Sequence, residues 1–287
     1  MADGNDIAVL ILAHTSPGGL AGLARFFAGA GCDLFVHVDA KADEAWFRDA
    51  ARPWPVRFIT PRINVFWRGF TMIDAMISLI QTAHGQKPYA RYVILSDDTL
   101  PLQPPDVIRN KLSGPEEFIT TREAEDFRFR YESFFLFDSV ATQIRWIPLR
   151  ERAVTPDLIA RMKRLEALMN RGKKKLERFW YGSQWMALTA AAMDKILRSW
   201  EDDAWLRDSF EFSEAPDESY FQTIIGESLG PVNRPLTYVD WNAPEPPRVF
   251  AELAEIEALN RPEFMFLRKA RLPAAQLDQW ITRLRAP

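Results

Sequence analysis

The sequence has one cysteine, few glycines and no recognisable phosphate-binding loop, and each shortage excludes a class of site. Cys32 alone cannot form an intramolecular disulfide or a thiolate metal site, which fits a reducing compartment. Only 13 glycines occur among the 287 residues, and neither GxxxxGK nor GxGxxG is present. The usual glycine-rich phosphate cradles are therefore excluded. A bound diphosphate would need side-chain cations, helix N-termini or a metal.

The chain also lacks a basic leader and a long apolar run. Two acids, Asp3 and Asp6, precede the first apolar run, which covers only residues 7–13, whereas a membrane span needs about 20 residues. The 36 basic and 39 acidic residues give a net charge of −3 without a global basic field, which argues against a nucleic acid partner. We therefore expect a cytoplasmic protein, lying at the inner face of the membrane if it contacts a membrane.

The first 120 residues alternate between strand-like and helix-like segments. Apolar runs at 7–13, 33–38, 56–59, 92–95 and 117–120 are typical of buried strands, and helical spacing of apolar residues follows Pro17 and covers 70–84. This alternation predicts an α/β fold with a mainly parallel central sheet and helices on both faces. With 47% apolar residues, and no repeat or linker, we predict a single domain.

The second half of the chain is less regular. Helices are expected over 155–171, 189–200 and 217–228, followed by an extended proline-rich stretch at 231–247 and a basic amphipathic segment at 271–285. The run RGKKK at 171–175 is typical of a solvated helix end, and the alternative is contact with an anionic substrate or membrane surface.

Polar residues follow three of the predicted strands. They are the Ala13-His14 pair, Asp39, and Asp98 with its neighbour Asp97. In open parallel sheets, ligands bind outside the carboxyl ends of the strands, so three such ends favour a nucleotide crevice. The plainer interpretation is that the acids cap turns and the histidine packs in the fold. Asp97 and Asp98 could alternatively hold a divalent metal.

A second group of candidates lies near residues 181–221. Pro216 begins a predicted helix and puts Asp217 and Glu218 on its first turn, where Asp217 is explained by the helix dipole. Glu218 there is rigidly aimed, as a general base acting on a substrate hydroxyl must be. Tryptophans offer flat faces on which sugars stack, although tryptophan is usually a core residue; the candidates are Trp67, Trp180, Trp185 and Trp241.

Seven short motifs occur in an order that resembles the core-2/I-branching N-acetylglucosaminyltransferase family, which includes the peptide O-xylosyltransferases. The similarity covers about residues 7–270. The motifs are FVHVDAK at 35–41, VFWRGFT at 65–71, LSDDTLPL at 95–102, GSQW at 182–185, PDE at 216–218, YVDW at 238–241 and FLRK at 266–269.

The resemblance implies a Rossmann-like, type A nucleotide-diphosphosugar transferase fold and inverting transfer from a UDP-sugar donor to a glycan or glycolipid acceptor, without a metal or other cofactor. Its residue-level implications can be transferred to this chain: Glu218 as the base, Lys269 and Arg248 on the diphosphate, and the nucleotide near Ala13, His14, Asp39 and Asp98. The acceptor or sugar would contact Trp67, Ser183, Gln184, Trp185 and Trp241. Within one domain, residues 1–120 would form the nucleotide-binding half, 121–270 the acceptor and catalytic half, and 271–287 an amphipathic helix.

This chain departs from the family pattern at Asp97, where glycine is usual, and at Thr99, where aspartate is usual, which leaves the donor sugar open between GlcNAc and xylose. The alternatives are a metal-dependent transferase that uses Asp97 and Asp98, a nucleotide- or sugar-binding scaffold without turnover, and a peripheral membrane adaptor that works through the basic C-terminal helix.

Overall fold

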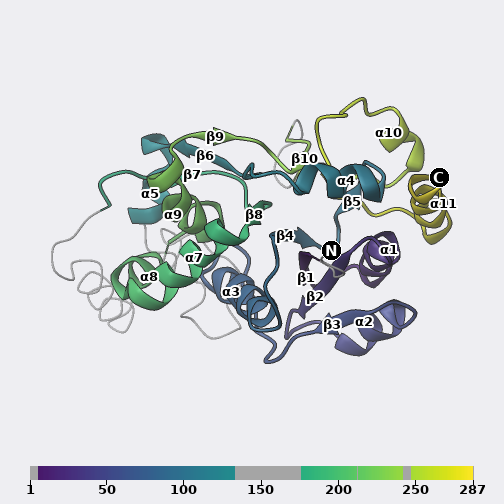
Figure 1. Cartoon of the computed structure of the whole chain (residues 1–287), viewed down its shortest axis with the longest axis horizontal. Helices are drawn as coiled ribbons and strands as arrows, with labels where there is room; N and C mark the ends of the chain where they lie inside the picture. Colours follow the sequence, from purple (N-terminus) through teal and green to yellow (C-terminus); the bar gives the residue numbers. More distant parts are fainter. Residues whose placement is uncertain (1–5, 133–175, 212, 242–246, 287) are drawn as a thin grey trace, which may run out of the picture.

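The computed structural model describes residues 6–132, 176–211, 213–241 and 247–286. The predicted helix at 155–171 and the RGKKK run lie outside these residues. The described elements, shown in Figure 1, are β1 (Ile7–Ala13), α1 (Pro17–Phe27), β2 (Cys32–Val38), α2 (Glu44–Ala51), β3 (Val56–Phe58), α3 (Thr71–His84), β4 (Arg91–Ser96), β5 (Leu100–Pro101), α4 (Pro105–Leu112), β6 (Thr120–Glu123), η1 (Glu125–Phe127), α5 (Phe129–Glu132), β7 (Trp180–Tyr181), β8 (Ala187–Thr189), α7 (Ala190–Asp202), α8 (Ala204–Phe210), η4 (Pro216–Glu218), α9 (Tyr220–Leu229), β9 (Val232–Asn233), β10 (Thr237–Val239), α10 (Leu253–Glu257), β11 (Phe266–Arg268) and α11 (Ala274–Arg285).

The central sheet confirms the predicted α/β fold. Its strand order is β3-β2-β1-β4-β8, in which β3, β2, β1 and β4 are parallel and β8 is antiparallel to β4. β1 is fully buried along its length, as its continuous apolar sequence predicts. The register pairs Ala13 with Val38, and Leu12 with Ser96, so the residues that follow β1, β2 and β4 meet at one edge of the sheet.

Alternate side chains of the strands feed two hydrophobic cores, one on each face of the sheet. Leu10, Phe35 and Ile94 pack on one face with apolar residues of α3, α7 and α9. Ile11 and Val36 pack on the other face with residues of α1, α2 and α11. Figure 1 shows helices on both sides of the central strands. Successive side chains of a strand point to opposite faces of the sheet, so each strand supplies apolar residues to both cores, as a doubly wound sheet requires.

Two small sheets extend from the central one and carry much of the second half. One has the order β10-β11-β5, and the other has the order β7-β6-β9. The strand expected at 117–120 begins three residues later, at Thr120, and Phe118 makes only an isolated bridge to Ala187. The proline-rich stretch expected as a loop contains the short strands β9 and β10.

The helix predicted over 217–228 is divided in two, which corrects the position given to Glu218. Ala215 has a left-handed backbone (φ 50°), and Pro216–Glu218 form a single 3-10 turn. Ser219 then leaves the helical region with φ −145°, and α9 starts only at Tyr220. Glu218 therefore projects from a short turn that precedes the helix. Because it lies outside the regular helix, its side chain is oriented by its own hydrogen bonds.

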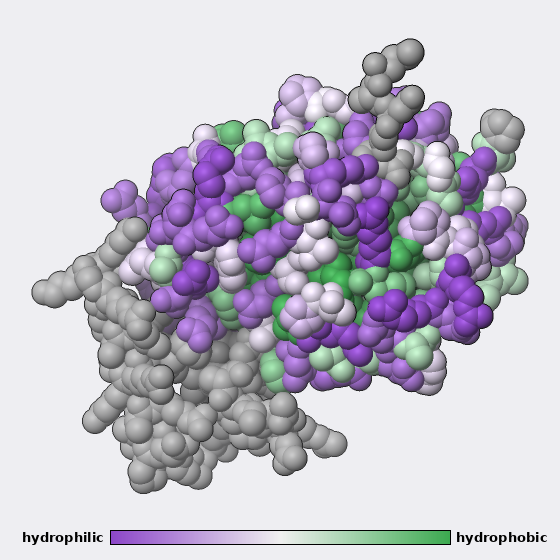
Figure 2. All heavy atoms as spheres, turned by 60° about the horizontal axis from the view of Figure 1, so that its bottom comes forward, coloured by the Kyte–Doolittle hydropathy of each residue, from purple (hydrophilic) through white to green (hydrophobic). Residues whose placement is uncertain are grey.

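The basic C-terminal segment forms α11 and packs on the body of the molecule. Trp280, Ile281 and Leu284 are buried, and Arg285 donates hydrogen bonds to three carbonyl oxygens at the end of α1 and just after it. Its apolar side is thus taken up by the fold. Within the described ranges, every helix is too short or too polar to cross a bilayer. The face in Figure 2 is mainly hydrophilic, with hydrophobic side chains gathered toward its middle.

Candidate active site

A single cleft of about 740 Å³ brings together most of the residues singled out in the sequence. It opens where β1, β2 and β4 end and is closed on its other side by residues near β6, β7, η4 and β9. Both halves of the chain contribute to its walls. The candidates that line it are Ala13, His14, Asp39, Trp67, Ser183, Gln184, Trp185, Glu218, Trp241 and Lys269. The candidates outside the lining are Asp97, Asp98, Trp180 and Arg248.

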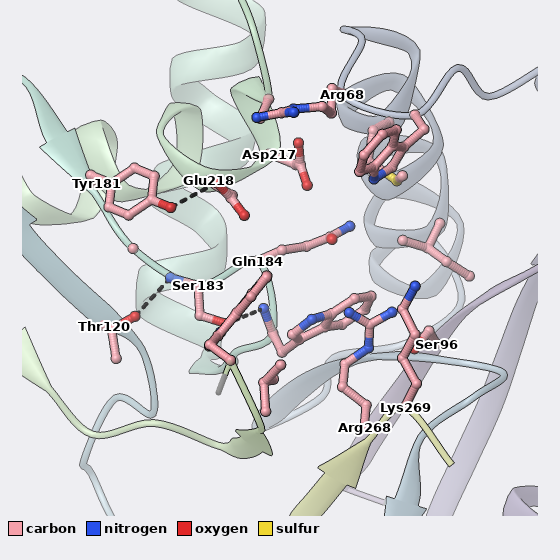
Figure 3. A pocket seen from close by; sticks show the side chains of 18 of the residues that line it. Arg68, Ser96, Thr120, Tyr181, Ser183, Gln184, Asp217, Glu218, Arg268 and Lys269 are labelled. Atoms are coloured by element: carbon pink, nitrogen blue, oxygen red, sulfur yellow. Dashed lines mark hydrogen bonds between the residues drawn. The ribbon is translucent and has the colours of Figure 1, made fainter. Parts of the chain in front are cut away.

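Glu218 is held by two hydrogen-bond donors on one carboxylate oxygen. Arg130 Nη1 lies 2.6 Å and the Tyr181 hydroxyl 2.8 Å from Oε2. Within the described part of the chain, no donor is bonded to Oε1. Figure 3 shows the carboxylate pointing into the cavity beside Tyr181. A fixed carboxylate with one oxygen facing a cavity has the geometry of a general base.

The neighbouring Asp217 has a different environment. It is nearly buried, its Oδ1 has no hydrogen-bond partner in the structure, and it lines the same cleft. Burial, followed by the negative charge of Glu218, raises the pKa of Asp217 to about 7, although Arg130 and Arg68 oppose the shift. The two acids thus differ in the donors they meet, and the helix-dipole interpretation of Asp217 does not explain its position.

Lys269 and Arg268 bring positive charge to the cleft from the end of β11. Figure 3 shows both side chains across the cavity from Asp217 and Glu218, with Gln184 between them. Arg268 lies over the ring of Trp185, with 4.3 Å from Cζ to the ring centroid, and donates to Asp98 Oδ1 at 3.2 Å. Burial, and then the charge of Arg268, lower the pKa of Lys269. No described residue forms a hydrogen bond or ion pair with its ammonium group.

Arg248, the second cation expected on the diphosphate, lies outside the cleft lining. Its guanidinium pairs with Glu255 at 2.6 Å and lies 3.8 Å from Asp240. The hydrogen bond with Glu255 raises the pKa of Arg248. Arg268, directly before Lys269 in the sequence, lines the cleft, as do Arg68, Arg122 and Arg130.

The acidic pair after β4 is surrounded by hydrogen-bond donors. Asp97 Oδ2 accepts three backbone N–H groups, and Asp98 accepts the Ser96 hydroxyl at 2.5 Å as well as Arg268. Donors directed at a carboxylate compete with a cation for its oxygens. Across the described ranges, no group of three or more acids, histidines or cysteines is arranged to hold a metal. The donor set therefore fits a structural role for both acids better than metal binding.

The three polar strand ends meet as expected. Asp39 accepts the Lys41 backbone N–H and its ammonium group, both at 2.9 Å, and lines the cleft beside Ala13 and His14. His37 is buried, and its Nε2 accepts the Ile63 N–H at 2.8 Å. Burial lowers the pKa of His37 to about 4, which favours the neutral ring, and His37 also lines the cleft. Asp98 also belongs to this edge, although it lies behind Arg268 and outside the lining.

The tryptophans divide into cleft and core residues. Trp67 and Trp241 line the cleft with 70% and 59% of their surface exposed, as sugar-stacking faces would be. Trp185 is buried beneath Arg268. Trp180 is fully buried, and its indole N–H donates to Glu227. Trp180 is thus a core residue, whereas the others remain candidates for contact with sugar.

The GSQW segment is fixed between β6 and η4. Ser183 N–H donates to the Thr120 hydroxyl at 2.7 Å, and Gly182 N–H donates to the Glu218 carbonyl at 2.9 Å. A Cβ on Gly182 would lie 1.7 Å from the Thr120 carbonyl oxygen, so only glycine fits between the two backbones. Gln184 is nearly buried and reaches toward Met76 Sδ. This packing couples the segment to the turn that carries Glu218.

Sequence reasoning missed Arg130, which donates to Glu218 from 88 residues away. It stacks over Phe127 and Tyr181, and no motif in its surroundings marks it as a functional residue. Arg68 lies inside the VFWRGFT motif but was assigned no role, and it pairs with Glu214 at 3.0 Å while lining the cleft. Only the fold brings these arginines to the acids.

Comparison with known proteins identifies a family. A family model described as Core-2/I-Branching enzyme matches residues 7–262. A solved structure of mouse xyloside xylosyltransferase 1, in its apo form, is similar over 78% of this chain and 82% of that chain, with 15% identity and a TM-score of 0.36. None of the curated proteins compared with the sequence matches it.

Proposed function

The chain belongs to the core-2/I-branching enzyme family, and from this premise we propose that it is a metal-independent, inverting transferase that moves a sugar from a UDP-sugar to an acceptor hydroxyl. Membership makes it a glycosyltransferase with a nucleotide-sugar donor and a glycan acceptor. GlcNAc and xylose are the proposed sugars. The observation that carries the proposal is the shared cleft, in which Glu218 faces Lys269 and Arg268.

In the proposed reaction, Glu218 Oε1 takes the proton of the acceptor hydroxyl. The acceptor oxygen bonds to the anomeric carbon from the face opposite the nucleotide, and the bond between that carbon and the phosphate oxygen breaks. The products are the glycoside with inverted configuration and UDP. Arg130 and Tyr181 bind only Oε2, which leaves Oε1 oriented toward the acceptor.

The leaving UDP gains negative charge as its bond to the sugar breaks. Cations placed beside it stabilise this transition state more than the ground state. Lys269 is the group best suited to this role, since its ammonium has no ion-pair partner in the described part of the chain and it lines the cleft. Arg268 supports it, while Arg248 is left as a secondary contact because its guanidinium is engaged with Glu255.

The donor arrangement around Asp97 and Asp98 supports a metal-independent reaction, because both carboxylates already accept hydrogen bonds from the protein. Uracil and ribose would lie by Ala13 and Asp39, where the strand ends offer polar groups, with His14 between the nucleoside and the diphosphate. Trp67 and Trp241 at the exposed rim would stack on acceptor sugars, with Ser183, Gln184 and Trp185 between donor and acceptor.

A donor screen with Glu218→Gln tests this proposal. Purified protein is incubated with UDP-GlcNAc or UDP-xylose and a panel of aryl glycosides, with EDTA or with Mn²⁺, and product and UDP are measured. We expect transfer that survives EDTA and falls about 10²–10⁴-fold in Glu218→Gln, the usual contribution of a general base. Glu201→Gln, at an exposed position of α7, is the matched control and should retain full activity.

Other outcomes would contradict the proposal in distinct ways. Loss of activity in EDTA with recovery in Mn²⁺ would favour a metal-dependent reaction through Asp97 and Asp98. Binding of UDP without transfer or hydrolysis of any donor, and without an effect of Glu218→Gln, would favour a nucleotide-binding scaffold.

A further inference from the structure

A carboxylate after β4 is bound by the turn that joins β1 to helix α1. Asp97 has no solvent exposure, and its Oδ2 accepts the backbone N–H groups of His14, Thr15 and Ser16 at 2.9, 2.8 and 2.7 Å. Converging N–H groups at a helix N-terminus form an anion site, which phosphates occupy in many nucleotide-binding proteins. Here the anion is part of the chain, so these N–H groups are already taken.

The strand, the turn and the helix are locked around this residue. Asp97 N–H donates to the Leu12 carbonyl at 3.0 Å, which holds the end of β4 against β1. A Cβ on Gly19 would lie 2.0 Å from the Asp97 carbonyl oxygen, so the first turn of α1 packs directly on the Asp97 backbone. Asp97 therefore holds the backbone of the turn from which the His14 side chain projects.

The second oxygen of Asp97, Oδ1, lies near the imidazole of His14. Oδ1 is buried without a regular hydrogen-bond partner in the structure, and His14 Nδ1 lies 3.5 Å from it. A buried ionised carboxylate is strongly favoured by a positive neighbour. The side chain of His14 is 52% exposed and lines the cleft, so one part of the ring faces Asp97 while the rest is accessible from the cavity.

The charges around His14 favour the imidazolium. The close contact with the Asp97 carboxylate raises the pKa of His14 above its ordinary value of 6.5, and the charges of Asp98 and Asp39 add to this effect, whereas burial opposes it. The cations of the same cleft, Arg268 and Lys269, act in the opposite sense as like charges. Arg268 is paired with Asp98 at 3.2 Å, which reduces its effect.

We propose that Asp97 is a positioning residue that holds His14 as an imidazolium in the cleft, where His14 binds the diphosphate of the donor together with Lys269. This inference rests on the proposed function, since it takes a nucleotide diphosphate as the ligand. Because Asp97 takes the N–H groups of residues 14–16, those backbone donors are not available to the phosphates, and the His14 side chain would bind them instead. Affinity for the donor should then fall as the pH rises through the pKa of His14.

The first experiment measures the coupling without any ligand. The chain has three histidines, so histidine-labelled protein gives three imidazole signals, which His14→Gln and His84→Gln assign. We expect His14 to titrate with a midpoint above 6.5, and the midpoint to fall in Asp97→Asn, which keeps the shape of the side chain but removes its charge. His37 and His84 should not move. A His14 midpoint at or below 6.5 in the unmodified protein would overturn the inference.

The second experiment measures the role in binding by calorimetry with UDP-GlcNAc, whose phosphates do not titrate between pH 5.5 and 8. We expect binding about tenfold tighter at pH 5.5 than at pH 8, as the gain of one charge-assisted contact predicts. Because Asp217 titrates in the same range, the decisive comparison is with His14→Gln. That variant should lose most of this ratio, and His84→Gln should keep it.

The outcomes separate this inference from the proposed function. If UDP-GlcNAc, UDP-xylose and UDP all fail to bind at either pH, the proposed function is wrong and the donor role of His14 fails with it. If they bind but His14→Gln leaves the pH ratio unchanged, the donor role of His14 is wrong while the function stands. If Asp97→Asn does not fold, two measurements still test the inference. They are the titration midpoint of His14 in the unmodified protein and the ratio of donor affinities at pH 5.5 and pH 8 in His14→Gln.

Discussion

Asp217 and Glu218 are adjacent in sequence, yet their side chains meet different partners. Glu218 accepts hydrogen bonds from Arg130 and Tyr181, while Asp217 is buried with one oxygen unpaired. Such a contrast separates the roles of two neighbouring acids, because Glu218 is oriented by its donors, whereas burial favours the neutral acid at Asp217.

The raised pKa of Asp217 gives the stability of the protein a pH dependence. The folded state holds this proton up to about pH 7, whereas the unfolded chain releases it near pH 4, so the free energy of unfolding should fall as the pH rises from about 4 to 7. Asp217→Asn removes this contribution. We measure the melting temperature of the variant minus that of the unmodified protein. This difference should be more positive at pH 8 than at pH 5. A difference that does not change with pH would contradict the raised pKa of Asp217.

Alanine variants of Lys269 and Arg248 test which of the two cations binds the diphosphate. Lys269→Ala should lower kcat/KM for the donor by about 10- to 100-fold, the effect of losing a charge-assisted hydrogen bond of about 1.5–3 kcal/mol. Arg248→Ala should change it by less than about threefold, since this guanidinium lies outside the cleft lining. Lys195→Met, at an exposed position of α7, is the control, and steady-state kinetics with varied donor is the measurement. An equal fall of kcat/KM in both variants would indicate that Arg248 also binds the diphosphate.

At the scale of elements, the short strand β7 and the turn η4 are joined by one close backbone approach. Gly182 follows β7, donates to the Glu218 carbonyl and leaves no room for a side chain against Thr120. This part of the cleft wall is thus assembled from short segments whose positions depend on one another.

Gly182→Ala should disturb this junction. A methyl group 1.7 Å from the Thr120 carbonyl forces the backbone to move, which we expect to cost about 1–3 kcal/mol in the free energy of unfolding and to reduce transfer as Glu218 shifts. Gly18→Ala is the matched control, because a Cβ there meets no atom within 4 Å and glycine is a poor helix former. Urea unfolding of both variants checks the prediction; equal stability would show that the junction yields without strain.

At the scale of the whole molecule, the cleft is shared between the two halves of the chain. Its walls combine the ends of β1, β2 and β4 with residues in β6 and residues in and directly after β7 and β11. A donor bound there would contact both halves and would bind only the folded state. Ligand binding and the stability of the entire fold should therefore be linked.

Nucleotide sugars should raise the melting temperature. At a donor concentration 100 times the Kd, the added stability is about 2.7 kcal/mol, which corresponds to several degrees for a chain of this size. Thermal shift with UDP-, GDP- and CMP-sugars is the measurement. We expect the UDP-sugars to give the largest shifts, and a larger shift with the GDP series would contradict the donor assignment.

The sequence alone predicted the four parallel strands of the central sheet, and most of the candidate site residues that it offered line the cleft. β1, β2, β4 and α3 follow directly from apolar runs and helical spacing, because a buried strand or helix needs that pattern wherever it lies. The break before Tyr220 was missed, since Asp217 to Ser228 has a helical pattern and only the backbone of Ser219 interrupts it. The position of Arg248 was inferred from spacing alone, which says nothing about its pairing with Glu255.

The sequence by itself determined the local elements and the polar residues at their ends, because hydrophobic periodicity and strand-end chemistry are properties of short segments. Only the tertiary structure decided which charges meet. Arg130 contacts Glu218, Asp97 binds the turn before α1 beside His14, and Arg268 lines the cleft while Arg248 does not. Electrostatic contacts depend on distances across the fold, and residues 80 or more positions apart can be brought within about 3 Å only by packing.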